Sequence, residues 1–342
     1  MRIEQVGGVT IVEGDATAGL RLLDDQSVNC CVTSPPYWGL RDYGVAGQLG
    51  LEPTPAEYVE RMVAVFREVR RVLRDDGTIW INLGDSYYGG KGQNGSSKAR
   101  ATAEERGYTQ SGGTVQMATR PSDMPIAGLK PKDLVGIPWR VAFALQADGW
   151  WLRSDIIWSK PNVMPSSVKD RCTTSHEYIF MLSKSAKYYY DADAIAEPAQ
   201  EWTGQAATFK RDSGKATVLR APGQSKPSHR ADRKQDNTGN RTYTGFNDRY
   251  DDMNPPKTRN KRSVWTVTTK PFKEAHFATF PPDLIEPCVL AGCPVGGVVL
   301  DPFSGAGTTG LVAQRHGRQA ILLELNPKYV DMTADRIKKE LA

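Results

Sequence analysis

The order of apolar and polar positions along the chain predicts short β-strands that alternate with α-helices. Runs of β-branched and aliphatic residues that end at glycine, proline or an acidic residue are typical of buried strands. Strands separated by helices indicate a mostly parallel sheet with helical crossovers. The predicted strands span residues 9–12, 28–32, 78–83, 151–158, 177–182 with a continuation to 188–190, 298–300 and 320–325.

The strongest helical signal begins at Thr54-Pro55-Ala56-Glu57, which is a capping box with proline at the first helical position. Apolar residues then recur at helical spacing from Tyr58 to Leu73, and Gly77 marks the predicted end of the helix. Weaker helical patterns lie near residues 20–23, 138–146, 284–291 and 309–315.

Two polar segments interrupt this pattern. The stretch rich in glycine and serine that begins at Gly89 predicts a mobile insertion over residues 91–130. Residues 199–262 have almost no apolar periodicity. They divide the predicted α/β domain into one part at 1–198 and another at 263–342.

The net charge of +5 is unevenly distributed, because residues 199–262 hold fourteen Lys and Arg against seven Asp and Glu. Aromatic residues lie among these charges in greater number than a solvated linker needs. Basic groups that contact phosphates, together with aromatic and polar groups that contact bases, are typical of nucleic-acid recognition. We therefore expect residues 199–262 to recognise a nucleic acid, with a disordered linker as the alternative. The aromatic residues are Trp202, Phe209, Tyr243, Phe246 and Tyr250.

Composition argues against several classes of protein. The chain is 39% hydrophobic and 24% charged, as in an ordinary globular protein. It has no run of eighteen apolar residues, and its first residues lack the apolar core of a secretory signal, so we expect a cytoplasmic protein without membrane contact. Its five cysteines lack CxxC spacing and its four histidines lack ligand spacing, which predicts neither a disulfide framework nor a metal site.

A glycine-rich loop, from Asp301 to Gly310, lies between the predicted strand 298–300 and a helix. Glycines let the backbone approach a ligand closely, and the free N–H groups of a helix N-terminus bind anionic groups. Glu324 closes the next strand, where its carboxylate can accept both hydroxyls of a ribose. These features predict a site for a nucleoside cofactor. The same features fit an enzyme that binds NAD. The structural alternative is a glycine turn that only joins the strand to the helix.

A second motif, Ser34-Pro35-Pro36-Tyr37, follows the predicted strand 28–32. The exocyclic amino nitrogen of a base is a poor nucleophile, because its lone pair is delocalised into the ring. Two acceptors aimed at its N–H bonds draw the nitrogen towards sp³ geometry, and the Ser34 hydroxyl and the Pro35 carbonyl can supply them. Tyr37 offers a flat face to a base that has left the stack. The structural alternative is that this motif only forms a proline turn at the end of a strand.

These residues resemble the β group of amino-methyltransferases, which modify DNA at cytosine N4 or adenine N6. The segment Val32–Tyr37 resembles the catalytic motif of that family, and Asp301–Gly307 resembles its cofactor loop. The catalytic motif precedes the cofactor loop in both, which is a circular permutation of the usual order. The resemblance covers residues 9–90, 131–193 and 265–335. It skips residues 91–130 and the basic segment 199–262, where members of the family typically differ and where target recognition usually lies.

The resemblance implies a seven-stranded, mostly parallel, circularly permuted sheet with a Rossmann-like methyltransferase fold. Target recognition is assigned to residues 199–262, packed along one edge of the sheet. S-adenosylmethionine and a flipped base of double-stranded DNA would meet at the carboxyl ends of the strands. A homodimer and a cognate restriction endonuclease are further candidate partners. The implied cofactor-binding residues are Asp15, Phe280, Asp301, Phe303, Ser304, Gly305, Gly307, Thr308 and Glu324, and the implied catalytic residues are Ser34, Pro35, Pro36 and Tyr37.

Serine before the proline pair favours cytosine N4 over adenine N6 in the resembled family. The physics permits both bases, since the two acceptors can engage either amino group. A NAD enzyme leaves Ser34–Tyr37 without a role. A DNA-binding regulator with a degenerate methyltransferase core has no need of an intact Ser34–Tyr37 or Asp301–Gly307.

Several side chains have a structural interpretation beside the functional one. Asp15 is predicted to cap a helix or to meet the adenine of the cofactor, and Asp85 to bind loop amides or to line the pocket. Lys160 is expected to be a solvated charge, and Tyr188–Tyr190 to pack within the sheet. Trp38 either covers the pocket mouth or fills the core.

If residues 199–262 contact phosphates, replacing Arg230, Arg233 and Lys234 with Ala will weaken DNA binding and flatten its salt dependence. Each lost phosphate contact should reduce the slope of log affinity against log salt by about 0.9. The measurement is a fluorescence-anisotropy titration of duplex DNA at several salt concentrations. Affinity that matches the parent at every salt concentration would instead identify the segment as a linker.

Overall fold

The computed structural model describes residues 1–40, 44–45, 47–89, 121, 126–199, 258–269 and 280–341. These residues belong to two compact units. The first unit comprises Met1–Ile195 and Lys261–Ala342, and the second comprises Ala196–Asn260. Most of the predicted insertion 91–130 and of the predicted recognition segment 199–262 lies outside the described residues.

Nine strands of the first unit form one sheet in the order β1-β2-β11-β10-β3-β4-β6-β5-β9. Neighbours from β2 to β4 are parallel, whereas β6 is antiparallel to both β4 and β5. The strands are β1 (Ile3–Val6), β2 (Val9–Glu13), β3 (Val28–Thr33), β4 (Leu73–Leu83), β5 (Trp151–Ser159), β6 (His176–Ser183), β9 (Val264–Thr266), β10 (Val298–Asp301) and β11 (Gln319–Glu324).

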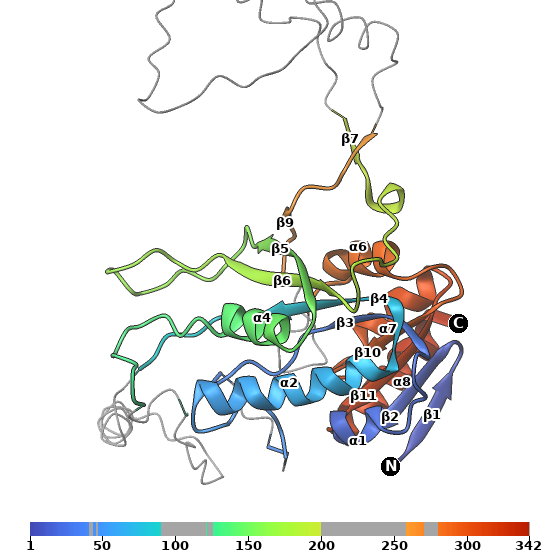
Figure 1. Cartoon of the computed structure of the whole chain (residues 1–342), viewed down its shortest axis with the longest axis horizontal. Helices are drawn as coiled ribbons and strands as arrows, with labels where there is room; N and C mark the ends of the chain where they lie inside the picture. The colour runs from blue at the N-terminus through green and yellow to red at the C-terminus, as the bar shows by residue number, and fades with distance from the viewer. Residues whose placement is uncertain are drawn as a thin grey trace, which may run out of the picture. The chain divides into compact units, whose positions relative to one another are not determined.

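Helices cover both faces of this sheet, as Figure 1 shows for α2 and α6 on opposite sides of β3, β4 and β10. Each face has its own hydrophobic core, and neighbouring residues of one strand face different cores. Cys31 and Leu323 pack with α1, α2 and α4, whereas Cys30 and Leu322 pack with α6, α7 and α8. The helices are α1 (Ala16–Leu20), α2 (Pro55–Val72), α4 (Ile137–Ala147), α6 (Pro282–Gly292), α7 (Thr308–Arg315) and α8 (Pro327–Leu341).

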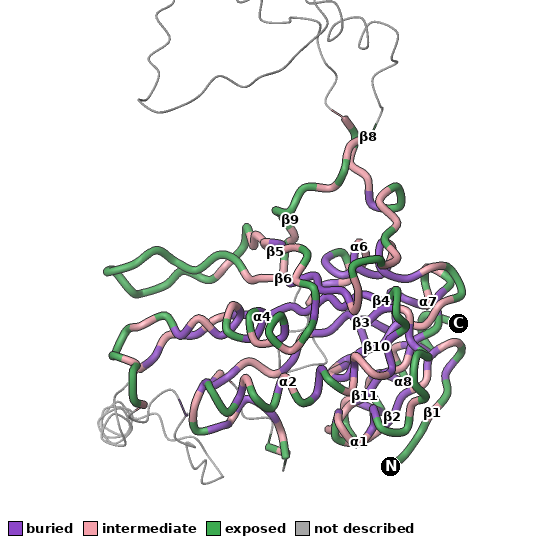
Figure 2. Tube along the Cα trace, viewed as in Figure 1, coloured by how far each residue is buried: buried purple, intermediate pink, exposed green. Residues whose placement is uncertain are grey.

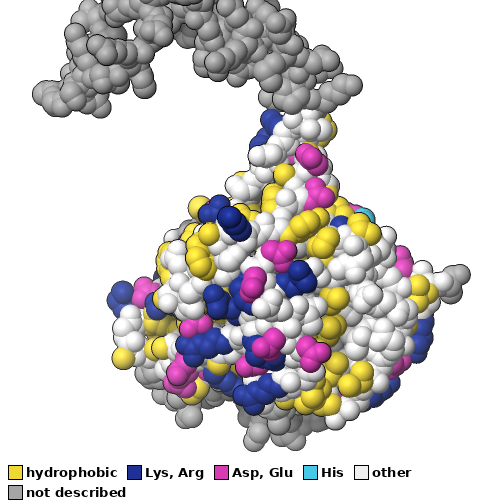
Figure 3. All heavy atoms as spheres, turned by 45° about the vertical axis from the view of Figure 1, so that its right-hand side comes forward, with side chains coloured by type: hydrophobic (Ala, Val, Ile, Leu, Met, Phe, Trp, Pro, Cys, Tyr) yellow, Lys and Arg dark blue, Asp and Glu magenta, His cyan; other side chains and the backbone are white. Residues whose placement is uncertain are grey.

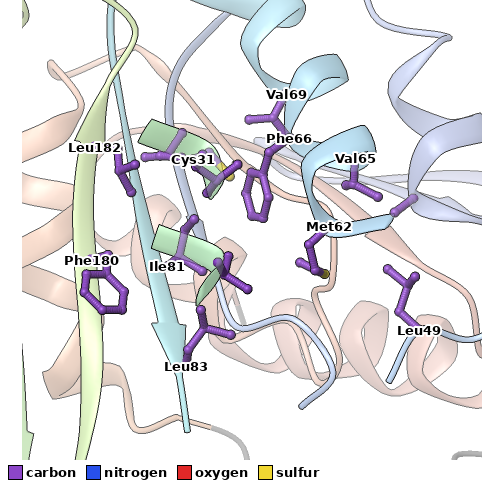
Figure 4. Close-up of a cluster of buried hydrophobic side chains, with 14 of the residues drawn as sticks. Cys31, Leu49, Met62, Val65, Phe66, Val69, Ile81, Leu83, Phe180 and Leu182 are labelled. Carbon is purple, nitrogen blue, oxygen red and sulfur yellow. The ribbon is translucent and has the colours of Figure 1, made fainter. Parts of the chain in front are cut away.

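The capping box at the start of α2 is present as predicted. The backbone N–H of Glu57 donates to the Thr54 hydroxyl, and Pro55 occupies the first turn. The apolar stripe of the helix faces the sheet, where Met62, Phe66 and Val69 point towards Cys31 and the end of β4 (Figure 4). Burial is continuous through the central strands and gives way to exposed backbone beyond the ends of β5 and β6 (Figure 2).

The predicted mostly parallel α/β class is confirmed, with differences at several element boundaries. Two edge strands, β1 and β9, extend the expected seven strands to nine. The first helix lies at Ala16–Leu20 rather than near 20–23, and Leu22 is exposed. Helix α2 ends at Val72 instead of Gly77, because Leu73 already has extended backbone angles and starts β4. Strand β6 ends at Ser183, so it does not continue to Tyr188–Tyr190.

Parallel strands place their carboxyl ends at one edge of the sheet, and the two predicted motifs follow neighbouring strands there. Ser34 follows β3 and Pro302 follows β10, and these strands pair through Val299–Cys30 and Leu300–Cys31. From β10 the chain proceeds through α7 to β11 on one side, while β3 continues through α2 to β4 on the other. The order of connection therefore reverses between β10 and β3, where open α/β sheets bind their ligands.

In the second unit, β7 (Glu197–Pro198) pairs antiparallel with β8 (Thr258–Arg259). Arg259 forms an ion pair with Glu197 across this pair, with 3.6 Å between Nε and Oε2. Across both units, none of the helices in the described ranges is long and apolar enough to span a membrane.

Replacing Phe66 with Ala should destabilise the first unit by about 3–5 kcal/mol, because its fully buried ring fills the space between α2 and the sheet. The matched control is Phe143→Ala, since the Phe143 side chain on α4 is 55% exposed and its loss should cost less than about 1 kcal/mol. Urea unfolding followed by tryptophan fluorescence measures both. Equal losses of stability would contradict this packing.

Candidate active site

The cofactor and target motifs line the same open cleft at the carboxyl edge of the sheet, with an empty space of about 700 Å³. The loop after β3 contributes Ser34 and Pro36, and the loop after β10 contributes Phe303 and Gly305. The ends of β2 and β11 provide the two acidic groups. The remaining wall comes from the segment before α2 and the start of α8. The lining residues are Gly14, Asp15, Ala16, Ser34, Pro36, Val45, Gly47, Gln48, Leu49, Pro302, Phe303, Gly305, Leu323, Glu324, Leu325, Asn326 and Tyr329.

Gly305 and Gly307 of the cofactor loop both have positive φ, but the absence of a side chain has a different consequence at each position. A Cβ added to Gly305 would meet no atom within 4 Å, so this position leaves the cleft open. A Cβ added to Gly307 would lie 2.4 Å from Cγ2 of Thr333 on α8. Gly307 therefore permits close packing of α7 against α8, and it is not among the residues that line the cleft.

Glu324 is tied to the glycine loop. Its Oε2 accepts the backbone N–H of Gly305 at 2.8 Å, and its Oε1 accepts that of Asn326 at 2.8 Å. Burial raises the pKa of this carboxyl to about 7, although the two amide donors oppose the shift. Because each carboxylate oxygen has further acceptor capacity, the side chain can still bind hydroxyl groups in the cleft.

Asp15 both caps a helix and lines the cleft, so the two interpretations of this residue are compatible. Its Oδ1 accepts the backbone N–H of Ala18 at 3.1 Å, which caps α1. The preceding residue, Gly14, donates its N–H to the Glu324 carbonyl at 2.8 Å. Strands β2 and β11 therefore place two acidic side chains beside each other on the cleft wall.

The Asp301 carboxylate is completely buried between the two motifs and does not line the cleft. Its Oδ1 accepts the Thr33 hydroxyl from β3 at 2.6 Å and the Phe303 amide at 3.0 Å. Its Oδ2 accepts the Thr309 hydroxyl from α7 at 2.6 Å. Burial raises its pKa to about 6, against the lowering effect of these donors. Asp301 therefore fixes the conformation of the cofactor loop through hydrogen bonds, without lining the cleft itself.

Three other predicted cofactor residues also lie outside the cleft lining. Phe280 packs against the core beneath α6, and the buried Thr308 hydroxyl accepts a hydrogen bond from Arg336 at 2.9 Å. Ser304 is buried too, and its hydroxyl has no hydrogen-bond partner within the described residues. Of the predicted set, Asp15, Phe303, Gly305 and Glu324 are the ones that line the cleft.

The loop Ser34–Tyr37 is hydrogen-bonded to its neighbours. The Tyr58 hydroxyl on α2 donates to the Pro36 carbonyl at 2.9 Å. None of the described residues donates a hydrogen bond to the carbonyl of Pro35, which is buried and is not among the residues that line the cleft. Ser34 is half-buried and lines the cleft. Its Oγ lies 3.4 Å from the Tyr37 hydroxyl and 3.4 Å from Asn82 Oδ1.

A polar network on β4, β5 and β6 supports this loop. The Tyr37 hydroxyl lies 2.8 Å from Glu177 Oε2 and 3.0 Å from Asn82 Oδ1. Glu177 also forms an ion pair with Lys160. Burial and the neighbouring Glu177 carboxylate raise the pKa of Tyr37 well above its usual range, so its hydroxyl is protonated and can donate. A Cβ added to Gly84 would lie 2.6 Å from the Tyr37 ring, so this glycine makes room for it.

Asn82 and Glu177 also belong to this polar network, although neither was predicted from the sequence. A signal for Asn82 was present, because it is the one polar position among the apolar residues that end β4. Glu177 carried no comparable signal, because a single acidic residue near the start of a strand is ordinary in sequence. Lys160, expected to be a solvated charge, has a side chain only 16% exposed and pairs with Glu177.

The structure also decides between the interpretations of three other features. Trp38 fills the core, with 1% of its surface exposed and its indole N–H bound to the Glu52 carbonyl. Asp85 accepts the amides of Ser86, Gly136 and Ile137, so it binds loop amides at the start of α4. Of the tyrosine run, Tyr190 stacks on Trp80, outside any strand. The described residues contain no cluster of three or more potential metal ligands.

Comparisons with known proteins identify a matching family and similar relatives. The family described as DNA methylase, which covers N6 and N4 methyltransferases, matches residues 28–335. The Type II methyltransferase M.Cfr9I of Citrobacter freundii is 47% identical over 339 residues, covering 98% of this chain and 90% of that protein. The Type II methyltransferase M.SmaI of Serratia marcescens is 43% identical over 331 residues, covering 96% and 90%.

Solved structures share the fold at lower identity. The PvuII DNA methyltransferase, described as cytosine-N4-specific, is 17% identical with a TM-score of 0.56, covering 97% of this chain and 90% of that chain. A putative DNA modification methylase from Thermus thermophilus, solved as a complex with S-adenosyl-L-methionine, is 23% identical with a TM-score of 0.53, covering 97% and 95%. Both confirm the predicted fold class.

Proposed function

The chain belongs to the DNA methylase family, and we propose that it methylates N4 of a cytosine flipped out of double-stranded DNA, at a specific site and with S-adenosylmethionine as the methyl donor. The observation that carries this proposal is the placement of Ser34 on the wall of the cofactor cleft, with its Oγ 3.4 Å from both the Tyr37 hydroxyl and Asn82 Oδ1. The family match supports methyl transfer to DNA, and the serine motif supports cytosine as the target.

The residues of the cleft fit the proposed cofactor. Gly305 leaves open space, Phe303 provides an apolar wall, and Glu324 and Asp15 supply carboxylates for ribose hydroxyls and the adenine amino group. When bound, S-adenosylmethionine supplies a methyl group on a positively charged sulfur, which is already an activated leaving group. The protein would therefore need to orient and activate the acceptor nitrogen, and no strong base would be required before transfer. The sulfur would leave as a neutral thioether, and the methylated nitrogen would then lose one proton to water.

Ser34 and the Pro35 carbonyl are the proposed activating groups. A serine hydroxyl accepts an N–H well only when its own proton is donated elsewhere, and here Tyr37 and Asn82 provide that second acceptor. The Pro35 carbonyl receives no hydrogen bond from the described residues and can accept the second N–H. Both interactions strengthen as the nitrogen becomes tetrahedral, so they act mainly on the transition state.

DNA binding by this chain requires positive charge near the cleft or on a separate segment. Acidic and basic side chains are interspersed on the face of the first unit shown in Figure 3. The positive surplus lies instead in residues 199–262, which we propose as the target-recognition segment. A homodimer and a cognate restriction endonuclease are further proposed partners on the family resemblance.

The target base can be identified directly. We expect DNA incubated with the purified chain and S-adenosylmethionine to yield N4-methylcytosine after digestion to nucleosides and mass spectrometry. N6-methyladenine in its place would assign the alternative base. DNA binding without any methyl transfer would favour a regulator with a degenerate core, and saturable NAD binding without a response to S-adenosylmethionine would favour a NAD enzyme.

Replacing Ser34 with Ala should lower the single-turnover methylation rate by roughly 10²-fold, as expected for one aligned hydrogen bond that strengthens in the transition state. Affinity for the cofactor and for DNA should change little. The control is Ser27→Ala, since the Ser27 hydroxyl donates to the Asp24 carbonyl in an exposed turn that does not line the cleft. If Ser34→Ala methylates DNA at the parental rate, Ser34 does not activate the amino group, and the motif is only a rigid turn beside the cofactor.

Affinity for S-adenosylmethionine should increase with pH up to about 7 and then level off. Glu324 has a raised pKa of about 7, so below this pH it is mostly neutral and a poorer acceptor for ribose hydroxyls. Binding favours the ionised form, so a proton is released and affinity falls by up to about tenfold per pH unit below the pKa. Calorimetry between about pH 5.5 and pH 8.5 measures both effects.

Glu324→Gln should bind the cofactor weakly and with little pH dependence, because its side chain does not titrate. The matched control is Glu340→Gln. Glu340 lies near the end of α8, where it forms an ion pair with Arg315 of α7, and it does not line the cleft. A pH-independent affinity of the parental chain over this range would contradict the role of Glu324.

A further inference from the structure

Glu177 receives three donors from three different elements. Lys160, which directly follows β5, pairs with its Oε1, while the Tyr37 hydroxyl and the Asn82 amide reach its Oε2 at 2.8 and 3.2 Å. The side chains of Lys160 and Glu177 are only 16% and 17% exposed, so the pair is largely removed from water. A buried carboxylate is costly unless it is paired and hydrogen-bonded, and this one satisfies both conditions.

The Asn82 amide has a single favourable orientation as a result. Its Nδ2 donates to Glu177 and to the Tyr178 carbonyl, each at 3.2 Å. Rotating the amide by half a turn would present an oxygen to two acceptors and lose both bonds. Asn82 Oδ1 is therefore directed to the opposite side, where the Ser34 and Tyr37 hydroxyls lie.

The Tyr37 hydroxyl is also directed by Glu177. It has one proton, and a carboxylate at 2.8 Å is a stronger acceptor than the amide oxygen at 3.0 Å. When the proton points to Glu177, the lone pairs of the phenol oxygen are left for the Ser34 proton. Both groups beside Ser34 Oγ then act as acceptors towards it.

We propose that Glu177, held by Lys160, is a positioning residue that directs the Ser34 proton away from the target base and so leaves the Ser34 oxygen to accept the amino N–H. This inference rests on the proposed function of Ser34. Glu177 does not line the cleft, so it acts through Tyr37 and Asn82 rather than on the base. Lys160 forms an ion pair with this carboxylate, and its Nζ lies 4.1 Å from the centre of the Trp158 ring, which holds the cation in place.

The test is a double-mutant cycle between Glu177→Gln and Ser34→Ala. Glutamine has the size of glutamate, but its amide group can donate towards Tyr37 and Asn82 and turn their acceptors away from Ser34. We expect Glu177→Gln alone to slow single-turnover methylation about tenfold or more, with DNA and cofactor affinities within about twofold of the parent. In the Ser34→Ala background the same substitution should change the rate by less than about twofold.

The matched control is Glu286→Gln, because Glu286 pairs with His316 on the α6 side of the first unit and does not line the cleft. This variant should methylate at the parental rate. Lys160→Arg should retain most of the activity, whereas Lys160→Met should reproduce the loss seen with Glu177→Gln, again only when Ser34 is present. If Glu177→Gln fails to fold, Lys160→Met takes its place in the double-mutant cycle with Ser34→Ala, and Lys160→Arg serves as its conservative control.

A parental rate for Glu177→Gln, or an equal loss of rate with and without Ser34, overturns the positioning role and leaves the proposed methyltransferase intact. A parental chain that transfers no methyl group to DNA overturns the proposed function, and this inference falls with it. The two failures are therefore distinguishable, because the cycle is interpreted only through the rate of an active parent.

Discussion

Three hydrogen bonds to one buried carboxylate set the distance between the two halves of the site. Asp301 binds Thr33, the residue before Ser34, and Thr309 on the helix that follows the glycine loop. It also binds the amide of Phe303, which lines the cleft. Because burial opposes its ionisation, each lost donor would make the charge still more costly, so the loops cannot shift independently. The hydrogen bonds of Asp301 therefore fix the relative positions of the two loops that line the cleft.

That contact joins residues 268 positions apart in the chain. The distance in sequence is large because the strand before the target loop comes early and the strand before the cofactor loop comes late. In the sheet, β3 and β10 are nevertheless direct neighbours. Circular permutation therefore leaves the site unchanged, since the carboxyl ends of adjacent parallel strands meet wherever the chain begins.

Features that depend on a few consecutive residues could be predicted from the sequence, and features that depend on register could not. The glycine loop, the Ser34 motif and Glu324 are local patterns at strand ends, and the cleft brings residues of all three together. Glu177 reaches Tyr37 only because β6 pairs antiparallel with β4, a register that no local pattern specifies. Helix α8, which crowds Gly307, had a signal that was missed: Val330, Ala334, Ile337 and Leu341 follow helical spacing.

The short β7–β8 pair fixes how residues 200–257 leave and rejoin the described chain. Adjacent antiparallel strands lie about 5 Å apart, so the two ends of this segment are brought together whatever lies between them. A replacement segment with closely spaced ends would therefore add little loop-closure entropy, because that cost grows only slowly with length. The β7–β8 pair would therefore accept a connecting segment of different length and sequence at little cost to the described fold.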